Sequence, residues 1–305
     1  MKLRIATRRS PLALWQARHV AAELTAHDPE LEVELVEMVT QGDKILDQAL
    51  SKVGGKDLFV KEIEQALIDG SADVAVHSLK DMPTKLPEGL TISAHPPRED
   101  PRDAWVSKRW SRFFDVPEGG RIGTSSLRRS AQLLRHRPDL KIEVLRGNVQ
   151  TRLARMEERG LDGTLLAHAG LVRLGMASAV SDVFPTDVLL PAVGQGILAV
   201  EVRADDEATW ARCRALDDGP SRAAATAERC FLDELQGGCQ VPIGGHATVE
   251  GGQLELVGMV CSLDGKTVYQ GIRNGPVADA EALGRSLAQE LLGQGADVIL
   301  RALLD

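Results

Sequence analysis

The stretch Leu3-Arg4-Ile5-Ala6-Thr7-Arg8-Arg9-Ser10-Pro11-Leu12-Ala13 sets out the structural unit that recurs along this chain. Its first five residues indicate a short strand that ends in a turn at Arg8-Arg9. Ser10 is a typical helix N-cap, Pro11 is typical of a first helical position, and residues 12–25 have the spacing of an amphipathic helix. Because a helix start presents free N–H groups, we expect an anion to bind there.

The same unit recurs twice in the middle of the chain. A strand signal followed by a cap residue and a helical run appears at 121–137 and again at 141–159. The turns between strand and helix are Ser125-Ser126 and Arg146-Gly147-Asn148. Arginines in and after these turns can bind carboxylates with two hydrogen bonds each. Two such turns side by side would hold a ligand with many acid groups.

The alternation of strands and helices predicts an α/β fold with a smaller C-terminal α+β domain. We expect a first α/β lobe, a second and basic lobe, and a ligand in the cleft between them. The Pro- and charge-rich segment 96–103 reads as a linker, and 279–304 reads as one closing helix. Further strands are expected at 31–39, 72–78 and 197–202, and further helices at 58–69, 205–216 and 221–235. The predicted domains are 1–96 with 197–216, then 102–193, then 219–305.

The composition is that of an ordinary globular protein of 305 residues, 43% of them hydrophobic. The N-terminus has no apolar run typical of a signal peptide, and no stretch is apolar enough to span a membrane. The cysteines at 213, 230, 239 and 261 lack the spacing of a metal site. We therefore expect a cytoplasmic protein with free thiols, no bound metal and no membrane partner.

The charge is distributed unevenly. The whole chain carries −8, yet residues 121–155 hold nine Lys or Arg against Asp139 and Glu143, which is +7. Such a patch favours an anionic ligand. Since the segment contains no Phe, Tyr or Trp on which bases could stack, a compact polycarboxylate fits better than a nucleic acid. A solvated helix face remains the alternative.

One cysteine lies in an unusual turn, Leu235-Gln236-Gly237-Gly238-Cys239-Gln240-Val241-Pro242-Ile243-Gly244-Gly245. The glycines before Cys239 remove the side chains that would block access to its thiol. The turn therefore suits a cysteine that carries a covalent group. A buried structural cysteine is the alternative, because free cysteines often pack as small apolar residues.

A second chemical signal stands at the end of an apolar strand. Lys80 and Asp81 follow Val74-Ala75-Val76-His77-Ser78-Leu79, and strand ends in open α/β sheets commonly supply catalytic groups. On its own, a Lys-Asp pair at a strand end is more often a surface turn. Their weight depends on what surrounds them.

Taken together, these stretches resemble one family. The motifs AVHSLKDMPT, IGTSSLRR, LRGNVQTR, RRSPLA, PAVGQG and the Cys239 turn stand in the order and spacing of the porphobilinogen deaminase family, also called the hydroxymethylbilane synthase family. The resemblance runs from Ile5 to beyond Ala247 and is looser in the last sixty residues.

The resemblance implies a transferase of tetrapyrrole (heme and porphyrin) biosynthesis. Members bind one dipyrromethane cofactor through a thioether to the cysteine that matches Cys239. They condense four porphobilinogen molecules head to tail, with loss of ammonia, and release the linear hydroxymethylbilane. The residue that matches Asp81 holds pyrrole N–H groups and stabilises azafulvene-like cations. Every pyrrole carries an acetate and a propionate, which gives the basic segment its ligand.

The resemblance also implies a set of binding residues. Those expected to bind the cofactor, besides Cys239, are Lys80, Asp81, Thr124, Ser125, Ser126, Arg128, Arg129, Arg146 and Gly147. Those expected to bind the substrate are Arg8, Ser10, Arg146, Arg152, Arg173 and Gln195. A segment over 51–57 resembles the family's active-site loop, and adds Lys56 and Phe59 as expected contacts. Uroporphyrinogen-III synthase is the expected recipient of the product.

Two other classes stay open at this point. The two-lobed plan is also that of periplasmic solute-binding proteins, so a receptor for a polycarboxylate is an alternative. It would need an export signal and would leave the Cys239 turn without a role. A nucleic-acid-binding regulator is the other alternative, and it predicts salt-sensitive binding without turnover. The absence of coiled-coil heptads favours a monomer.

Overall fold

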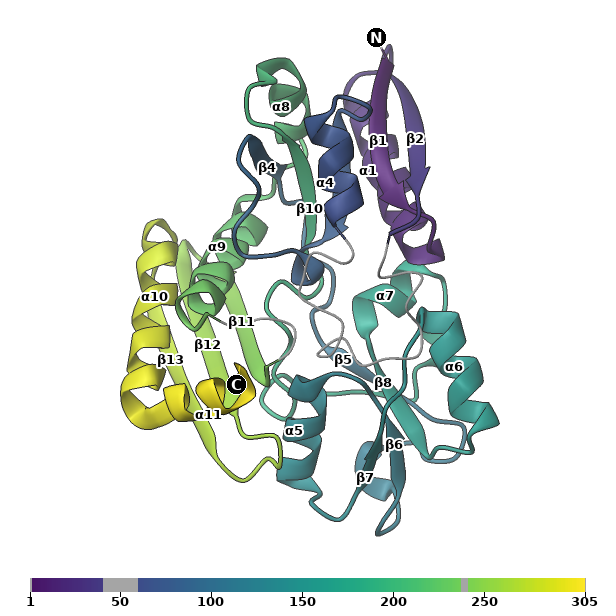
Figure 1. Cartoon of the computed structure of the whole chain (residues 1–305), viewed down its shortest axis with the longest axis vertical. Helices are drawn as coiled ribbons and strands as arrows, with labels where there is room; N and C mark the ends of the chain where they lie inside the picture. Colours follow the sequence, from purple (N-terminus) through teal and green to yellow (C-terminus); the bar gives the residue numbers. More distant parts are fainter. Residues whose placement is uncertain (1, 41–59, 237–240, 305) are drawn as a thin grey trace.

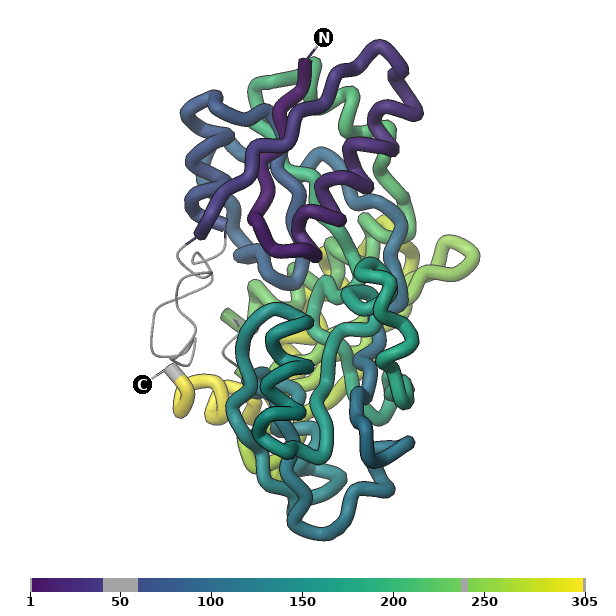
Figure 2. Tube along the Cα trace, turned by 90° about the vertical axis from the view of Figure 1, so that its right-hand side faces the viewer, coloured from purple at the N-terminus to yellow at the C-terminus, as the bar shows by residue number. Residues whose placement is uncertain are grey.

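The structure, a computed structural model, describes residues 2–40, 60–236 and 241–304 of the chain. Three sheets are arranged along an elongated molecule (Figure 1), with the N-terminus at one end of the long axis (Figure 2). Within the described ranges, every helix is too short or too polar to span a membrane.

The first lobe is built on a five-stranded mixed sheet. β1 runs parallel to β2 and β3, whereas β10, which comes from far along the chain, lies antiparallel between β3 and β4. Its strands in spatial order are β2 (Glu32–Met38), β1 (Lys2–Arg8), β3 (Val74–Ser78), β10 (Leu198–Arg203) and β4 (Leu90–Ala94), and its helices are α1 (Pro11–His27), α4 (Lys61–Ile68) and α8 (Glu207–Arg214). The predicted strands and helices of this lobe are confirmed, apart from residues 58 and 59, which lie outside the described ranges.

The second lobe has a sheet of the same size. β6 runs parallel to β7 and β8, and β5 lies antiparallel between β8 and β9. In spatial order the strands are β7 (Lys141–Glu143), β6 (Arg121–Gly123), β8 (Gly163–Ala167), β5 (Asp103–Val106) and β9 (Asp182–Val183), and the helices are α5 (Leu127–His136), α6 (Val149–Glu158) and α7 (His168–Arg173). Both predicted strand-turn-helix units are confirmed.

The third part packs helices against an antiparallel three-stranded sheet. Phe231 lies fully buried at its centre, where only a glycine fits at position 258, because an added Cβ would be 2.5 Å from the ring. Its elements are α9 (Gly219–Glu234), β11 (Ile243–Glu250), β12 (Gln253–Cys261), β13 (Val268–Pro276), α10 (Ala280–Leu291) and α11 (Asp297–Leu304). The predicted fold class, two α/β lobes with a smaller α+β domain, is confirmed. The exact domain bounds stay a prediction.

Short 3-10 helices link several of these elements. They are η2 (Leu79–Asp81), η3 (Phe113–Asp115), η4 (Ala177–Ala179) and η5 (Val277–Asp279). The first of them matters here, because it carries Lys80 and Asp81.

The predicted helix starts are confirmed by their side-chain caps. Ser10 accepts a hydrogen bond from the backbone N–H of Ala13, and Asn148 accepts one from Thr151. Ser126, the second of the two predicted serines, caps α5 by accepting from the N–H of Arg129. These local signals place three helix starts as expected.

The single closing helix predicted over 279–304 is wrong. The chain forms α10, then a π-helical turn over Leu292–Ala296, then α11. Gly295 adopts φ 113°, which glycine tolerates and other residues rarely do. Amphipathic spacing continues across this kink, so the pattern alone does not reveal it.

The linker predicted at 96–103 does connect β4 of the first lobe to β5 of the second, except that residue 103 already belongs to β5. Arg98 forms a buried ion pair with Glu228 of α9, and Asp100 binds both Arg102 and His168. Asp103 is fully buried as the first residue of β5. The segment is rich in charge because it makes ion pairs with distant parts of the chain.

Candidate active site

Lys80 and Asp81 are held at the end of β3 from two sides. Gln16 of α1 donates from its side-chain amide to the hydroxyl of Ser78, at 2.8 Å. The backbone N–H of Leu79 donates to the carbonyl of Ile197, just before β10. The turn that carries the two residues is therefore fixed to the rest of the first lobe.

Gln195 connects Lys80 to the second lobe. The Lys80 ammonium donates to the Gln195 side-chain oxygen at 3.3 Å. The amide nitrogen of Gln195 in turn donates to the carbonyl of Pro101 at 2.6 Å and to the Asp103 carboxylate at 3.1 Å. Gln195 is buried, so this bridge between the lobes is shielded from water.

Asp103 binds both arginines at the start of α5. Arg128 donates from Nη1 to one carboxylate oxygen of Asp103 at 2.8 Å. Arg129 donates from Nε and Nη2 to the other oxygen, at 3.0 and 2.6 Å. Burial alone would raise the pKa of Asp103, but Arg128 and Arg129 hold it well below its usual range.

This arrangement corrects the expectation of a freely charged basic patch. Arg128 and Arg129 already have a carboxylate partner inside the protein, and both side chains are buried. Two more arginines of segment 121–155 pair with its two acids, Arg121 with Glu143 and Arg137 with Asp139. The free positive charge of the segment is therefore smaller than its composition suggests.

The arginines of the second strand-turn-helix unit have fewer hydrogen-bond partners within the protein. Arg152 donates from Nε to the carbonyl of Gly147 at 2.8 Å. Burial, with a contribution from Arg129 and against the effect of Asp81, lowers its pKa to about 10, so it remains charged at neutral pH. Nη1 of Arg146 is buried and has no hydrogen-bond partner among the described residues. A buried guanidinium nitrogen without a partner favours an additional anion or hydrogen-bond acceptor beside it.

Gly147 and the residues of the first turn have structural roles as well. Gly147 adopts φ 120°, and a Cβ there would lie 2.6 Å from Thr151. Thr124 is buried, and its hydroxyl accepts from the N–H of Ser126. Ser125 donates to the carbonyl of Leu145, which ties the first turn to the second.

Three predicted substrate residues lie at the junction of the lobes or where β1 leads into α1. Arg173, at the end of α7, donates to the carbonyl of Gly196 at 2.8 Å and lies over the ring of Trp15 at 5.8 Å. Burial lowers its pKa to about 10. Arg8 ends β1, and Ser10 caps α1.

Charged side chains of both lobes lie close enough together to affect the pKa of Lys80. Burial lowers the pKa of Lys80 to about 8, and the charges that act on it are those of Asp81, Arg129, Asp103 and Arg128. Lys80, Asp81, Arg128, Arg129, Arg152 and Gln195 thus form the centre of the candidate site. Cys239, Lys56 and Phe59 lie outside the described residues.

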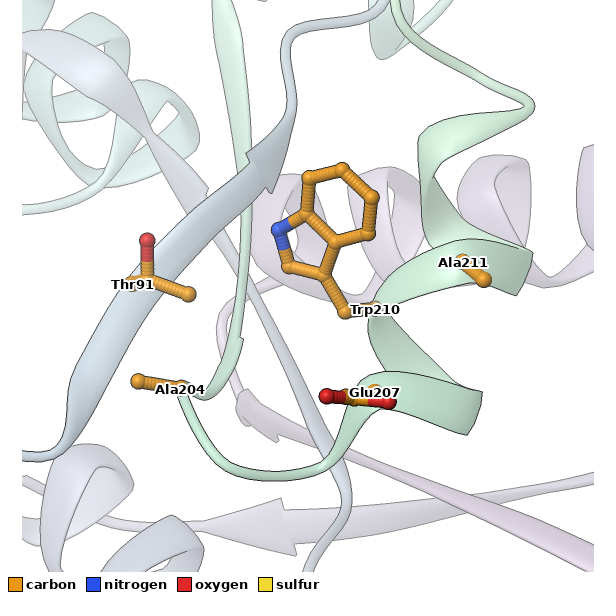
Figure 3. A pocket seen from close by; sticks show the side chains of 5 residues that line it. All are labelled: Thr91, Ala204, Glu207, Trp210 and Ala211. Carbon is orange, nitrogen blue, oxygen red and sulfur yellow. The ribbon is translucent and has the colours of Figure 1, made fainter.

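A surface pocket of about 540 Å³ lies elsewhere, between β4 and α8 (Figure 3). It is lined by Thr91, Ala204, Glu207, Trp210 and Ala211. None of these is a predicted site residue, and the pocket is not part of the candidate site.

Comparison with known proteins identifies the family. Residues 3–211 match the family model for the porphobilinogen deaminase dipyromethane cofactor binding domain, and residues 223–293 match the model for the porphobilinogen deaminase C-terminal domain. The chain belongs to the porphobilinogen deaminase family. The porphobilinogen deaminase of Syntrophotalea carbinolica is 54% identical over 301 residues, which covers 99% of this chain and 96% of that protein. That of Brevibacillus brevis is 52% identical over 304 residues, covering 99% and 98%.

As a porphobilinogen deaminase, the chain is a transferase of tetrapyrrole biosynthesis with a dipyrromethane cofactor and porphobilinogen as its substrate. It condenses four porphobilinogen molecules into the linear hydroxymethylbilane. The family match favours this function over a solute-binding protein or a nucleic-acid-binding regulator.

Solved structures of solute-binding proteins also resemble the chain. A putative methionine-binding lipoprotein from Bacillus subtilis superposes with a TM-score of 0.45 at 12% identity, covering 70% of this chain and 89% of that one. The methionine-binding protein MetQ gives 0.46 at 14% identity, with the same coverage. A likeness at this level does not bear on what this chain binds.

Sequence reasoning missed Asp103. Its position in a charged segment made it look like part of a linker. A signal was present, because Asp103 directly precedes the apolar residues Ala104-Trp105-Val106. A carboxylate entering a buried strand needs a cation, and Arg128 and Arg129 are the partners that the fold supplies.

Proposed function

We propose that the cofactor is attached to Cys239 and that its acid groups are held by the two strand-turn-helix units of the second lobe. The buried Nη1 of Arg146, which has no partner among the described residues, is the observation that carries this proposal. A carboxylate beside it would satisfy a cation that burial otherwise disfavours. The residues present therefore fit a ligand with several acid groups.

The N-termini of α5 and α6 add to this fit. Both helices begin with a capped turn, so each has further free N–H groups and a positive dipole end at its start. Thr124, Ser125, Ser126 and Gly147 would then hold the cofactor through hydroxyls and backbone groups. When bound, dipyrromethane supplies the pyrrole carbon to which the first porphobilinogen is joined.

We assign the catalytic role to Asp81. Its carboxylate acts on both Lys80 and Arg152, so it lies where cations of the two lobes meet. Loss of ammonia from porphobilinogen leaves positive charge on the substrate, next to a pyrrole N–H. A fixed carboxylate at that place accepts a hydrogen bond from the pyrrole N–H. It lowers the energy of the cation, and no solvent has to reorganise as the charge forms.

The substrate's own acid groups would be held by Arg8, Ser10, Arg146, Arg152, Arg173 and Gln195. Arg173 is supported by its position at the junction of the lobes. Gln195 lies at the same junction, where its amide already donates to Pro101 and Asp103. Lys56 and Phe59 are proposed as contacts of the segment before α4.

We also propose the cellular setting. The protein works in the cytoplasm as a monomer and passes its product to uroporphyrinogen-III synthase. It does not use nucleic acid as a partner, because the basic segment has no Phe, Tyr or Trp on which bases could stack.

Replacing Asp81 tests the catalytic assignment. Asp81→Asn is nearly isosteric, so the protein should fold and carry its cofactor while turnover falls by roughly a hundred- to a thousand-fold, or about 2.7 to 4 kcal/mol. Asp81→Glu keeps the charge but displaces it, and should keep a small residual activity. Product formation is measured at equal folded concentration, with exposed Asp205→Asn as the control. Normal turnover of Asp81→Asn would refute the role.

A further inference from the structure

Asp103 is a fully buried carboxylate that accepts hydrogen bonds from three side chains. It accepts from Arg128, from Arg129 and from the amide of Gln195. It contributes no atom to the surface, so it cannot itself touch a ligand. Its effect on the site must pass through the groups that it holds.

Those groups are cations that would otherwise repel one another. Arg128 and Arg129 are neighbours in the chain, and each also donates to one backbone carbonyl, Leu190 and Leu165 respectively. Burying two guanidinium groups side by side costs free energy, and a carboxylate between them offsets that cost. Asp103 supplies it, and Gln195 extends the same network to the Lys80 ammonium.

We propose that Asp103 is a positioning residue for the transferase reaction: it fixes Arg128 and Arg129 side by side and, through Gln195, holds the Lys80 ammonium beside them as one cationic wall. This inference rests on the proposed function in one respect, that the wall faces acid groups of the cofactor or substrate. The geometry of the wall itself is independent of that role.

The charges around Lys80 give the proposal a measurable consequence. Burial lowers the pKa of Lys80 to about 8, with Asp81 and Asp103 opposing this effect and Arg129 and Arg128 adding to it. Removing the charge of Asp103 removes one of the two opposing carboxylates. The Lys80 ammonium then loses its proton at lower pH, so a larger fraction of Lys80 is uncharged at neutral pH.

The test follows the titration of Lys80 in the full chain. Lysine is labelled with ¹³C at Cε, and the Lys80 signal is identified by its absence from Lys80→Arg. In the wild type it should titrate near pH 8. In Asp103→Asn we expect the midpoint to fall by on the order of one pH unit. An unchanged midpoint in folded Asp103→Asn overturns the proposal.

Two further variants separate charge from packing. Asp103→Glu keeps the carboxylate, and its Lys80 should titrate closer to the wild type than in Asp103→Asn. Asp139→Asn is the matched control, because Asp139 also pairs with an arginine through Nε and Nη2 but lies beyond the C-terminal end of α5. A shift in Asp139→Asn as large as that in Asp103→Asn would contradict a specific role.

A second variant tests the proposal if Asp103→Asn does not fold. If Asp103→Asn fails to fold, Gln195→Met replaces it, since this change removes the bridge to Lys80 and leaves the ion pair of Asp103 in place. A lower Lys80 midpoint there supports the proposal, and an unchanged one overturns it. The proposed function is checked separately by intact mass: Arg129→Gln with full cofactor content and full turnover would contradict the acid-group contacts, whatever Lys80 does.

Discussion

Glu228 shows how much of this molecule depends on single buried charges. Its carboxylate accepts from Arg98 at 2.6 Å, from the N–H of Gly194 at 2.6 Å and from the N–H of Ala247 at 2.7 Å. These groups belong to segment 96–103, to the turn that leads to Gln195 and to β11. One side chain of α9 therefore connects the C-terminal domain to the bridge between the lobes.

Replacing Glu228 should destabilise the protein strongly. Glu228→Gln leaves Arg98 buried without its counter-charge, a change that costs about 3 to 5 kcal/mol of the free energy of unfolding. The control is Glu281→Gln, which breaks an exposed pair with Arg285 and should cost under about 0.5 kcal/mol. Urea unfolding at pH 7 measures both, and equal losses would contradict the role of the buried pair.

The same variant should show a defined pH dependence. Arg98 and His246 hold the pKa of Glu228 below its usual value despite burial, which acts the other way. A lowered folded-state pKa stabilises the protein above the unfolded value of about 4.3, and this stabilisation is lost as the pH falls through the folded value. The difference between wild type and Glu228→Gln should therefore shrink in acid.

Individual residues were predictable from the sequence only where their partners lie nearby in the chain. Ser10, Pro11 and Asn148 were predictable as helix starts, because their partners lie within three residues. The partner of Arg98 is 130 residues away, and Asp103 is 26 residues from Arg129. Such pairs form only when the fold brings distant segments together, so a local pattern shows the charge but not its partner.

At the scale of elements, α5 is the helix whose start matters most. Ser126→Ala removes its cap and should cost about 1 kcal/mol of stability. Because the freed turn also carries Arg128 and Arg129, cofactor content and turnover should fall as well. Asp218→Ala removes the cap of α9 and should cost similar stability without that loss. Calorimetry and a turnover assay compare them, and equal turnover would count against a special role for α5.

The sequence predicts most of the strands and helices, but not the shape of the closing helix. Strands and helices with regular apolar spacing were placed to within a few residues. The closing helix was not, because the kink at Gly295 depends on a glycine whose added Cβ would meet the hydroxyl of Tyr269 at 2.8 Å. That contact comes from β13 and leaves no trace in the helical pattern.

At the scale of the whole molecule, the turn between β12 and β13 docks on α5. A Cβ on Gly265 would lie 2.4 Å from the N of Arg135 and 2.5 Å from the O of Ala131. This contact, with the apolar cluster of Ala131, Leu190, Met259 and Cys261, joins the C-terminal domain to the second lobe. The third part is therefore packed against the lobe that carries the proposed cofactor contacts.

Substitutions at two glycines distinguish the cost of losing the contact with α5 from the cost of backbone strain. Gly252 has φ 77° with nothing near a Cβ, so Gly252→Ala should cost about 1 to 2 kcal/mol for the left-handed conformation alone. Gly265 has φ 75° and adds the contact with α5, so Gly265→Ala should cost more. Urea unfolding gives both values. Equal losses would mean that the turn does not dock tightly.

Intact mass shows whether a cofactor is bound covalently to Cys239. The thiols of Cys213 and Cys261 are buried, and burial raises their pKa values to about 12 and about 11, so neither is a reactive thiolate at neutral pH. We expect the wild-type protein to be heavier than its sequence by two porphobilinogen units less two ammonia molecules. Cys239→Ser should lose this mass, and Cys230→Ser should keep it. An adduct retained in Cys239→Ser, or absent from the active wild type, would show that Cys239 does not carry the cofactor.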